Sequence, residues 1–432
     1  MSSRVLLALA AVLALPAAGP AVTGTGRPQT EESTLASGAR WAAIVPASWN
    51  GVLLLHSRGY AAEAGTPDPA PARYREALLS AGYALAASNY GAGGWSVAEA
   101  VPAQEEAVAA FARRYGKPRR VIGYGFSMGG LVTTALAERE HPALDGAIAL
   151  CSSMGGSLAM MNMGLDGAFA FRTLVAPQAG IELTGIADDR ANAARVAAAA
   201  RKAAQTPQGR ARLVLVATLA GIPAWVPPQA GEPDEKAFDR QIAALVSTFP
   251  MGVFLPRAEQ EHRAGGTFSW NTAVDYLRQL ETSGQAEFVG RAYRQAGLNL
   301  DADLSALAQA PRVAAAPAAV DYMARYYIPT GRPKVPLLAL QALGDTVTSP
   351  SLQQGYAAVA PAAMMQSLYV AQAGHCDFSS EQVLEAIFRV GRRLDSGRWP
   401  APAATHVLKG PAPLLRPCFQ GNRCPGRPLG SG

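Results

Sequence analysis

Charged and aromatic residues are scarce in this sequence, and cysteine is rarer still. Of 432 residues, 16% are charged, 7% are aromatic and only four are cysteine. Because 49% are hydrophobic, the chain has enough apolar side chains for a large core and is too apolar for a disordered protein. The net charge of +6 is scattered, without a run of five or six basic residues, which argues against nucleic-acid binding.

The sequence also lacks the short motifs of cofactor and metal proteins. It contains no P-loop, no dinucleotide-binding fingerprint and no spacing of cysteine and histidine that resembles a metal site. We therefore expect neither a cofactor nor a metal.

The first 21 residues have the pattern of a secretory signal peptide. Arg4 is followed by an apolar run over residues 5–15 and by small residues over 16–21. The apolar run is shorter than the roughly 20 residues that a membrane-spanning helix needs. We expect cleavage after Ala17, Ala18 or Ala21, and hence a periplasmic or secreted protein without a stable membrane anchor. An uncleaved anchor is the alternative.

A glycine-flanked serine follows the strand-like residues 121–124. The pattern is Gly125-x-Ser127-x-Gly129, and a helix-forming segment comes directly after it. A serine on such a turn has a strained backbone that lifts its hydroxyl above the sheet, and its neighbours must be small because Cβ atoms would clash there. A glycine-rich turn without catalysis is the alternative, because the pattern is common.

Two later strand-like runs lead into an acid and a histidine. Asp345 follows residues 335–343, and His375 follows residues 367–370. Asp377 and Asp321 are the reserve candidates for the acid. The remaining histidines His141, His262 and His406 have no comparable setting.

The chain order Ser127, Asp345, His375, with each residue after a strand, resembles the α/β-hydrolase superfamily. The resemblance covers roughly residues 40–155 and 333–395. It implies an α/β-hydrolase fold, a mostly parallel central sheet with helices on both faces. It also implies that His375 takes the proton of Ser127 while Asp345 fixes the imidazole tautomer.

The same resemblance points to the groups that would stabilise an oxyanion. The N–H of Met128, directly after the serine, would be one donor. The family loop that supplies the second donor begins His-Gly, whereas this chain has His56-Ser57. We therefore expect Ser57 or Arg58 to supply that N–H, and His56 to brace the loop.

The middle of the chain lies outside the resemblance. The separation of Ser127 from Asp345 is about twice what a domain without an insertion needs, and alanine-rich helical segments fill it. We expect a large, mostly helical cap over residues 157–330, inserted between two parts of the core at 22–156 and 331–398. A Pro/Gly-rich tail follows at 399–432.

Four residues are candidates for lining a substrate pocket. Met160, Met161 and Met163 stand where the chain enters the cap, and flexible thioethers suit an adaptable apolar pocket. Trp95 lies in a glycine-rich loop and is the fourth candidate. The alternatives are ordinary helix packing for the methionines and a surface position for Trp95.

The four cysteines allow three pairings in an oxidising compartment. Cys418 and Cys424 are close in the chain and can close a small loop. This leaves Cys151 and Cys376, which we expect to be bonded and to brace the histidine loop, provided that their Cα atoms lie within about 7 Å. A cysteine directly after the histidine is similar to the tannase and feruloyl-esterase group, in which it pairs with a cysteine directly before the serine. Phe126 occupies that position here.

These features favour a serine hydrolase that cleaves a small-molecule carboxylic ester through an acyl-enzyme intermediate. An aminopeptidase or amidase and a C–C bond hydrolase are alternatives with the same machinery. A member that uses the cavity only for binding is the alternative from another class.

Overall fold

The computed structural model describes residues 27–223, 243, 246, 257–403, 405–407, 411–421, 424, 426 and 427. The expected signal peptide over residues 1–21 lies outside the described residues.

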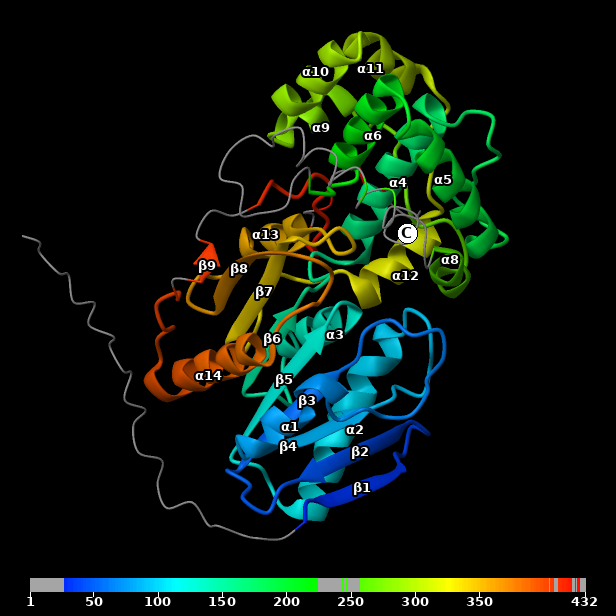
Figure 1. Cartoon of the computed structure of the whole chain (residues 1–432). Coiled ribbons are helices and arrows are strands. Elements are labelled where there is room, and N and C mark those ends of the chain that lie inside the picture. The colour runs from blue at the N-terminus through cyan, green and yellow to red at the C-terminus, as the bar shows by residue number, and fades with distance from the viewer. Residues whose placement is uncertain are drawn as a thin grey trace, which may run out of the picture.

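A nine-stranded sheet with the order β1-β2-β4-β3-β5-β6-β7-β8-β9 runs through the lower part of the molecule as Figure 1 shows it. The inner strands from β4 to β8 pair in parallel, whereas β1, β2 and β9 pair antiparallel at the two edges. The strands are β1 (Gln29–Thr34), β2 (Arg40–Val45), β3 (Val52–Ser57), β4 (Ala84–Ser88), β5 (Arg120–Phe126), β6 (Gly146–Leu150), β7 (Leu337–Gly344), β8 (Met365–Ala373) and β9 (His406–Val407).

Helices cover both faces of the sheet because its inner strands are apolar on both sides. In β6, Ala147 and Ala149 face one core, while Ile148 and Leu150 face the other. The first core is shared with α2 (Val97–Tyr115), α3 (Met128–Ala137) and α13 (Pro350–Ala357), and the second with α1 (Ala72–Ser80) and α14 (Ser380–Ser396). Strands buried on both faces are typical of parallel sheets. The expected α/β architecture is therefore confirmed.

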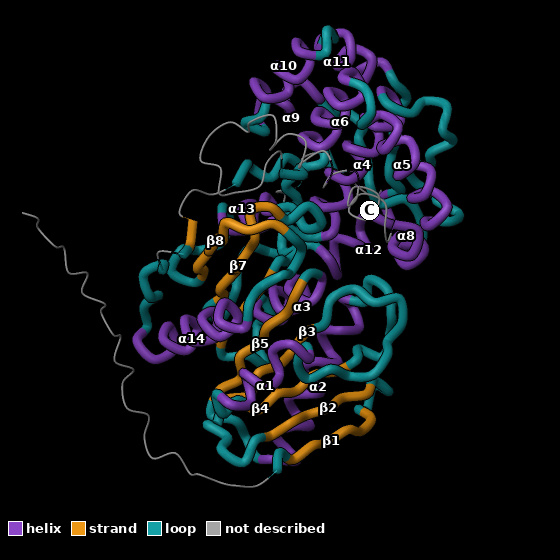
Figure 2. The backbone as a smooth tube through the Cα atoms, in the orientation of Figure 1, coloured by secondary structure: helices purple, strands orange, loops and turns teal. Residues whose placement is uncertain are grey.

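Between β6 and β7 the described residues form helices and no strand. We call residues 157–330 the helical insertion; in Figure 2 its helices gather on one side of the molecule, beyond the strands. Its helices pack around a separate apolar core that includes Phe169, Leu213 and Val289. The helices are α4 (Ser157–Leu174), α5 (Asp189–Ala203), α6 (Pro207–Leu219), α8 (Arg257–Ala264), α9 (Tyr276–Thr282), α10 (Ala286–Gln295), α11 (Leu300–Gln309) and α12 (Pro317–Tyr327).

A buried ion pair joins the helical insertion to residues 411–421, which we call the C-terminal segment. Asp166 of α4 is fully buried, and Arg416 Nη1 lies 2.7 Å from its Oδ2. Gln279 and Tyr276 also donate to this carboxylate, and Arg416 Nη2 donates to the Trp270 carbonyl. The C-terminal segment is therefore part of the packing that holds the insertion.

We expect Arg416→Met to lower the free energy of unfolding by about 3–5 kcal/mol near neutral pH, because the Asp166 charge would stay buried without its cation. Burial raises the pKa of Asp166, and Arg416 acts against that rise. Loss of Arg416 therefore raises this pKa further. A carboxyl group with a raised folded-state pKa contributes stability at low pH that is lost as the pH rises through that pKa. The loss in the free energy of unfolding should thus be larger near pH 8 than near pH 4. At the lower pH the Asp166 carboxyl can bind a proton, and a neutral carboxyl no longer needs the cation of Arg416.

Denaturant unfolding of the wild type and Arg416→Met at the two pH values measures this effect. The matched variant Arg416→Met/Asp166→Asn removes both charges and should recover part of the loss at high pH. A loss that does not change with pH would show that Arg416 contributes packing alone.

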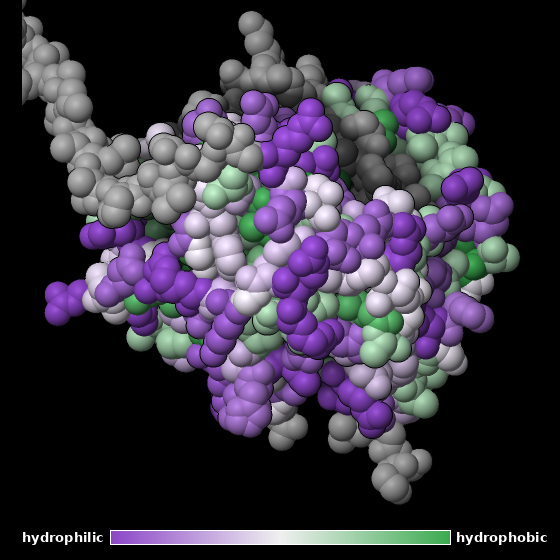
Figure 3. Space-filling view, turned by 90° about the horizontal axis from the view of Figure 1, so that it is seen from below, coloured by the Kyte–Doolittle hydropathy of each residue, from purple (hydrophilic) through white to green (hydrophobic). Residues whose placement is uncertain are grey.

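Hydrophilic side chains cover much of the face that Figure 3 shows, and apolar ones lie between them in small groups. None of the helices within the described ranges combines the length and the hydropathy that crossing a membrane requires.

Candidate active site

Ser127 stands on the sharp turn between β5 and α3. Its backbone has φ 57° and ψ −125°, a conformation that side-chain-bearing residues rarely adopt. A Cβ on Gly125 would overlap the backbone of Gly129, and a Cβ on Gly129 would overlap the carbonyl of Ser57. Glycine is therefore required on both sides of the serine, as the sequence pattern indicated.

The structure brings the three candidate catalytic side chains into one chain of contacts. Ser127 Oγ lies 3.0 Å from His375 Nε2, and His375 Nδ1 lies 2.8 Å from Asp345 Oδ2. The Asp345 side chain is fully buried, whereas a quarter of the His375 side chain is exposed. This arrangement lets the imidazole take a proton from the serine while the carboxylate holds the opposite nitrogen.

Asp345 is itself held by donors that the sequence analysis did not include. The N–H groups of Val347 and Thr348 donate to Oδ1 at 2.9 and 3.0 Å. Gln341 Nε2 and Thr348 Oγ1 lie 3.1 and 2.8 Å from Oδ2. Hydrogen bonds to a carboxylate fix its orientation. A polar Gln341 inside an otherwise apolar strand is the signal in the sequence that could have identified one of these donors.

The structure places the reserve acids away from the imidazole. Asp377 is largely exposed and pairs with Arg73 at 3.2 Å. Asp321 pairs with Arg427 on the surface.

His56 serves as a brace for the loop after β3. Its Nδ1 lies 2.7 Å from the Asp68 carbonyl, and burial lowers the pKa of its imidazole. A buried histidine that donates to a backbone carbonyl holds the loop in place.

The loop after β3 passes beside the serine. A Cβ on Gly59 would lie 3.5 Å from Ser127 Cβ, so residues 57–59 border the nucleophile. The Ser57 hydroxyl is buried and accepts from Gln104 Nε2 at 3.0 Å, which turns it toward α2. Met128 is the buried first residue of α3. The oxyanion candidates Met128, Ser57 and Arg58 thus flank Ser127 from two elements.

Cys151 and Cys376 form a disulfide at the histidine loop. Their Cα atoms are 5.2 Å apart, although the strand that carries Asp345 lies between their own strands. Both residues have positive φ, 43° and 61°, so each loop bends toward the other. Cys376 Sγ lies 3.4 Å from His375 Nε2, and Thr348 Oγ1 lies 2.8 Å from the Cys151 carbonyl oxygen. The disulfide therefore borders both the histidine and the residue that holds Asp345.

The second disulfide joins Cys418 to Cys424.

The sulfur atoms of Cys151 and Cys376 and a nitrogen of His375 lie within 4.8 Å of one another. Because the two sulfurs are bonded to each other, this group offers an ion a single imidazole and is not a metal site.

The four candidate pocket residues lie where the core meets the helical insertion. Trp95 is buried; its Nε1 donates to Ser157 Oγ at 2.6 Å and its N–H donates to Glu259 at 2.9 Å. The surface position considered for Trp95 is therefore wrong. Met161 and Met163 are buried and Met160 is partly buried. All three pack in the first core, which the sheet shares with α2, α3 and α13.

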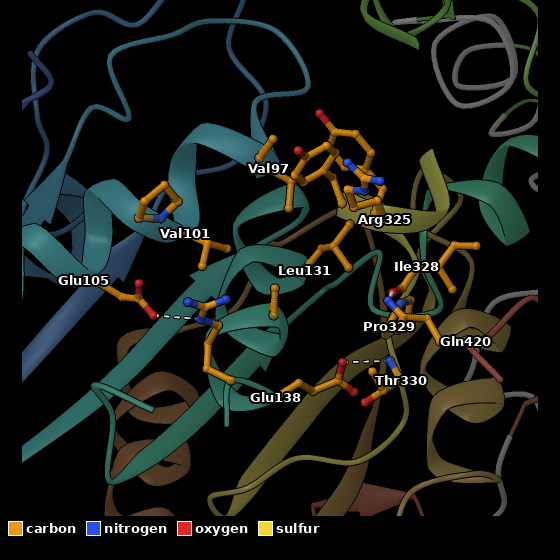
Figure 4. Close-up of a pocket in the computed structure, with 16 residues that line it drawn as sticks. Val97, Val101, Glu105, Leu131, Glu138, Arg325, Ile328, Pro329, Thr330 and Gln420 are labelled. Atoms are coloured by element: carbon orange, nitrogen blue, oxygen red, sulfur yellow. Dashed lines mark hydrogen bonds and ion pairs between the residues drawn. The ribbon is translucent and has the colours of Figure 1, made fainter. Parts of the chain in front are cut away.

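A groove of about 410 Å³ that none of these residues line lies between α2, α3 and α12 (Figure 4). Its charged groups are largely satisfied within the protein. Glu105 pairs with Arg139 at 3.0 Å, and Glu138 accepts from the N–H of Thr330 at 2.7 Å. No triad residue lines the groove, so it is separate from the candidate active site.

Comparison with known proteins gives one relative that spans most of the chain. The o-phthalyl amidase of Xanthobacter agilis is 31% identical over 413 residues, which cover 86% of this chain and 89% of the amidase. No family model matches the chain.

Solved structures with a similar course of the chain include two esterases. Feruloyl esterase B from Aspergillus oryzae has a TM-score of 0.45 and 14% identity, covering 85% of this chain and 80% of that one. An esterase from Pyrococcus furiosus has a TM-score of 0.37 and 13% identity, covering 86% and 93% of the two chains.

Proposed function

The chain belongs to the α/β-hydrolase superfamily and is a hydrolase, and on that basis we propose that it cleaves carboxylic acid amides, and the matching esters, with Ser127 as nucleophile. One observation carries this proposal: Ser127 Oγ, both nitrogens of His375 and the buried Asp345 form an unbroken chain of contacts at 3.0 and 2.8 Å.

The reaction follows from that geometry. His375 Nε2 accepts the hydroxyl proton as Ser127 Oγ attacks the carbonyl carbon, and Asp345 stabilises the imidazolium that forms. The N–H of Met128 and an N–H of the 57–59 loop stabilise the oxyanion, a contribution of several kcal/mol in such sites. His375 then gives its proton to the leaving nitrogen or oxygen, and the acyl group stays on Ser127. Water, with His375 again as base, releases the carboxylic acid.

The amide is the first choice of substrate because the relative that spans most of the chain is an o-phthalyl amidase. We infer an aromatic acyl group with a carboxylate beside the scissile carbonyl. An ester, which the sequence pattern favoured as the first choice, is the second choice here. An alcohol is a better leaving group than an amine, so an enzyme that acylates its serine from an amide should also react with the ester of the same acid.

We expect the purified protein to release phthalate from both the monoanilide and the monoethyl ester of phthalic acid. Chromatography of the products measures both reactions, and Ser127→Ala is the matched control. Cleavage of the ester alone would favour an esterase. Cleavage of amino-acid anilides with a free amine, and not of the phthalic substrates, would favour an aminopeptidase. If neither bond is cleaved and phthalate binds, the protein is a binding member of the superfamily.

We also propose that the protein is exported and loses its first residues. Arg4, the apolar run over residues 5–15 and the small residues after it support this. Sequencing the N-terminus of protein recovered from the periplasm or medium should give a start after Ala17, Ala18 or Ala21. An intact Met1 on membrane-bound protein would indicate an uncleaved anchor instead.

A further inference from the structure

The guanidinium of Arg58 has no carboxylate partner among the described residues. Its Nη1 donates to the Gly59 carbonyl at 3.1 Å, and its Nη2 donates to the carbonyls of Ala92 and Asn89 at 2.7 and 3.3 Å. Its Cζ lies 4.5 Å from the centre of the Tyr90 ring. These contacts orient the group and leave its positive charge uncompensated.

Other arginines of this region are paired with acids. Arg263 pairs with Glu259 and Glu99, and Arg73 pairs with Asp377. Arg58 differs from them because every group that holds it is neutral.

The lack of a counter-charge has a cost. Burial lowers the pKa of Arg58, because removing a cation from water is unfavourable unless an anion lies nearby. A guanidinium has five N–H donors. The three hydrogen bonds above leave two of them, and the Nε–H is buried without a partner. A carboxylate that accepted from the remaining Nη1–H would supply the missing charge and one of the missing acceptors.

The backbone of the loop that carries Arg58 borders the candidate active site, and Arg58 Nη1 lies 3.1 Å from the Gly59 carbonyl oxygen. Gly59, the residue after Arg58, borders Ser127, since a Cβ on Gly59 would lie 3.5 Å from Ser127 Cβ. Arg58 is only partly buried, in contrast to Ser57 before it. An acyl group bound for attack by Ser127 would therefore lie next to residues 57–59.

We propose that Arg58 binds a carboxylate on the acyl part of the substrate, so that the enzyme selects acids with a second carboxylate close to the scissile carbonyl. This inference rests on the proposed hydrolase function and assigns it a specificity-determining side chain. The Arg58 backbone N–H remains an oxyanion candidate, and side-chain substitution leaves that N–H in place.

Three 4-nitroanilides test the proposal: the ortho-carboxylate (phthalic), the para-carboxylate (terephthalic) and the unsubstituted benzoic anilide. Release of 4-nitroaniline gives kcat/KM for each. The wild type should prefer the ortho-carboxylate, and Arg58→Met should lower kcat/KM for that substrate about 10- to 100-fold, as expected for a lost charge-assisted hydrogen bond. The value for the benzoic anilide should fall by a smaller factor, so that the ratio between the kcat/KM values for the ortho-carboxylate and the benzoic anilide falls. Arg58→Lys, which keeps the charge and loses the planar fork, should lie between.

Arg73→Met is the matched control, because Arg73 is also a cation near the site, on the other side of the histidine loop, where it donates to the Cys376 carbonyl. It should leave the ratio between the ortho-carboxylate and benzoic substrates unchanged. An equal loss on all three substrates in Arg58→Met would show that Arg58 only braces the loop over residues 89–92, and would overturn the proposal while the hydrolase function stands.

Two measurements keep the proposal testable if Arg58→Met does not fold or if no anilide is cleaved. In the wild type, raising NaCl from about 0.02 to 0.5 M should lower kcat/KM for the ortho-carboxylate and spare the neutral anilide, because salt screens the ion pair. An equal salt effect on both overturns the proposal. If the wild type cleaves nothing, the hydrolase function fails by itself. Calorimetric titration then decides: phthalate should bind more weakly to Arg58→Lys than to the wild type, by less than the about 10- to 100-fold expected for Arg58→Met, and equal binding overturns the assignment.

Discussion

Replacing Ser127 with alanine is expected to lower kcat on the order of 10⁴-fold or more while the protein stays folded. The hydroxyl that would form the acyl-enzyme is lost, and the substitution removes few packing atoms. His375→Ala and Asp345→Asn should have effects of similar size, since the three side chains act as one unit at 3.0 and 2.8 Å. Turnover of the phthalic monoanilide measures all three, with circular dichroism as the check on folding.

Asp377→Asn is the control for the acid. Asp377 lies two residues from His375 and pairs with Arg73 on the surface, so we expect near-wild-type turnover. If Asp345→Asn were active and Asp377→Asn inactive, the acid would be reassigned. Wild-type hydrolysis by Ser127→Ala would contradict the whole mechanism.

Removing the Cys151–Cys376 disulfide should lower kcat on the order of 10²-fold, the size expected when a catalytic group shifts by about 1 Å. Cys376 is the residue after His375, and the carbonyl of Cys151 lies 2.8 Å from Thr348 Oγ1. Loss of the bond would therefore loosen the histidine and a contact of the acid together. The double variant Cys151→Ser/Cys376→Ser tests this without leaving a free thiol.

The second disulfide provides a matched control. Cys418→Ser/Cys424→Ser removes the bond between Cys418 of the C-terminal segment and Cys424, and we expect its turnover to match the wild type. Mild reduction should then inactivate this control variant as strongly as the wild type, because both contain the Cys151–Cys376 disulfide. Activity should be lost at temperatures at which the reduced protein is still folded. Full activity after reduction would show that packing alone positions His375. A free thiol at Cys376 in active exported protein would contradict the pairing.

The inner strands of the sheet could be predicted because their signals are local in the chain, whereas the edge strands β1 and β9, in polar or Pro/Gly-rich segments, were not predicted. Apolar runs such as that of β3, and the glycines around Ser127, each reflect a steric requirement that the nearest residues meet. The order of Ser127, Asp345 and His375 then placed three distant residues at one edge of the sheet, because parallel strands end there together.

The surroundings of the triad could not be predicted in the same way. Trp95 was a candidate for lining a pocket, yet its partners are Ser157 and Glu259, which come from two helices of the insertion. The role of Thr348 depends on a turn three residues after Asp345, and the uncompensated charge of Arg58 depends on the carbonyls of the loop over residues 89–92. These contacts come from tertiary packing, which a single sequence does not encode as a local pattern.

The pairing of Asp166 with Arg416 also bears on folding, because Arg416 is made long after the insertion. The two residues are 250 positions apart, so their contact closes one of the longest loops in the chain, at an entropic cost that grows slowly with length. β7 pairs with β6 inside the sheet, and the ribosome synthesises β7 only after the whole insertion. The insertion and the sheet thus depend on the same late segments. We expect residues 157–330 on their own to fold poorly, because Arg416 lies outside this segment and Asp166 would be buried without its cation. In the full chain, the insertion and the sheet can be completed only after Arg416 has been made.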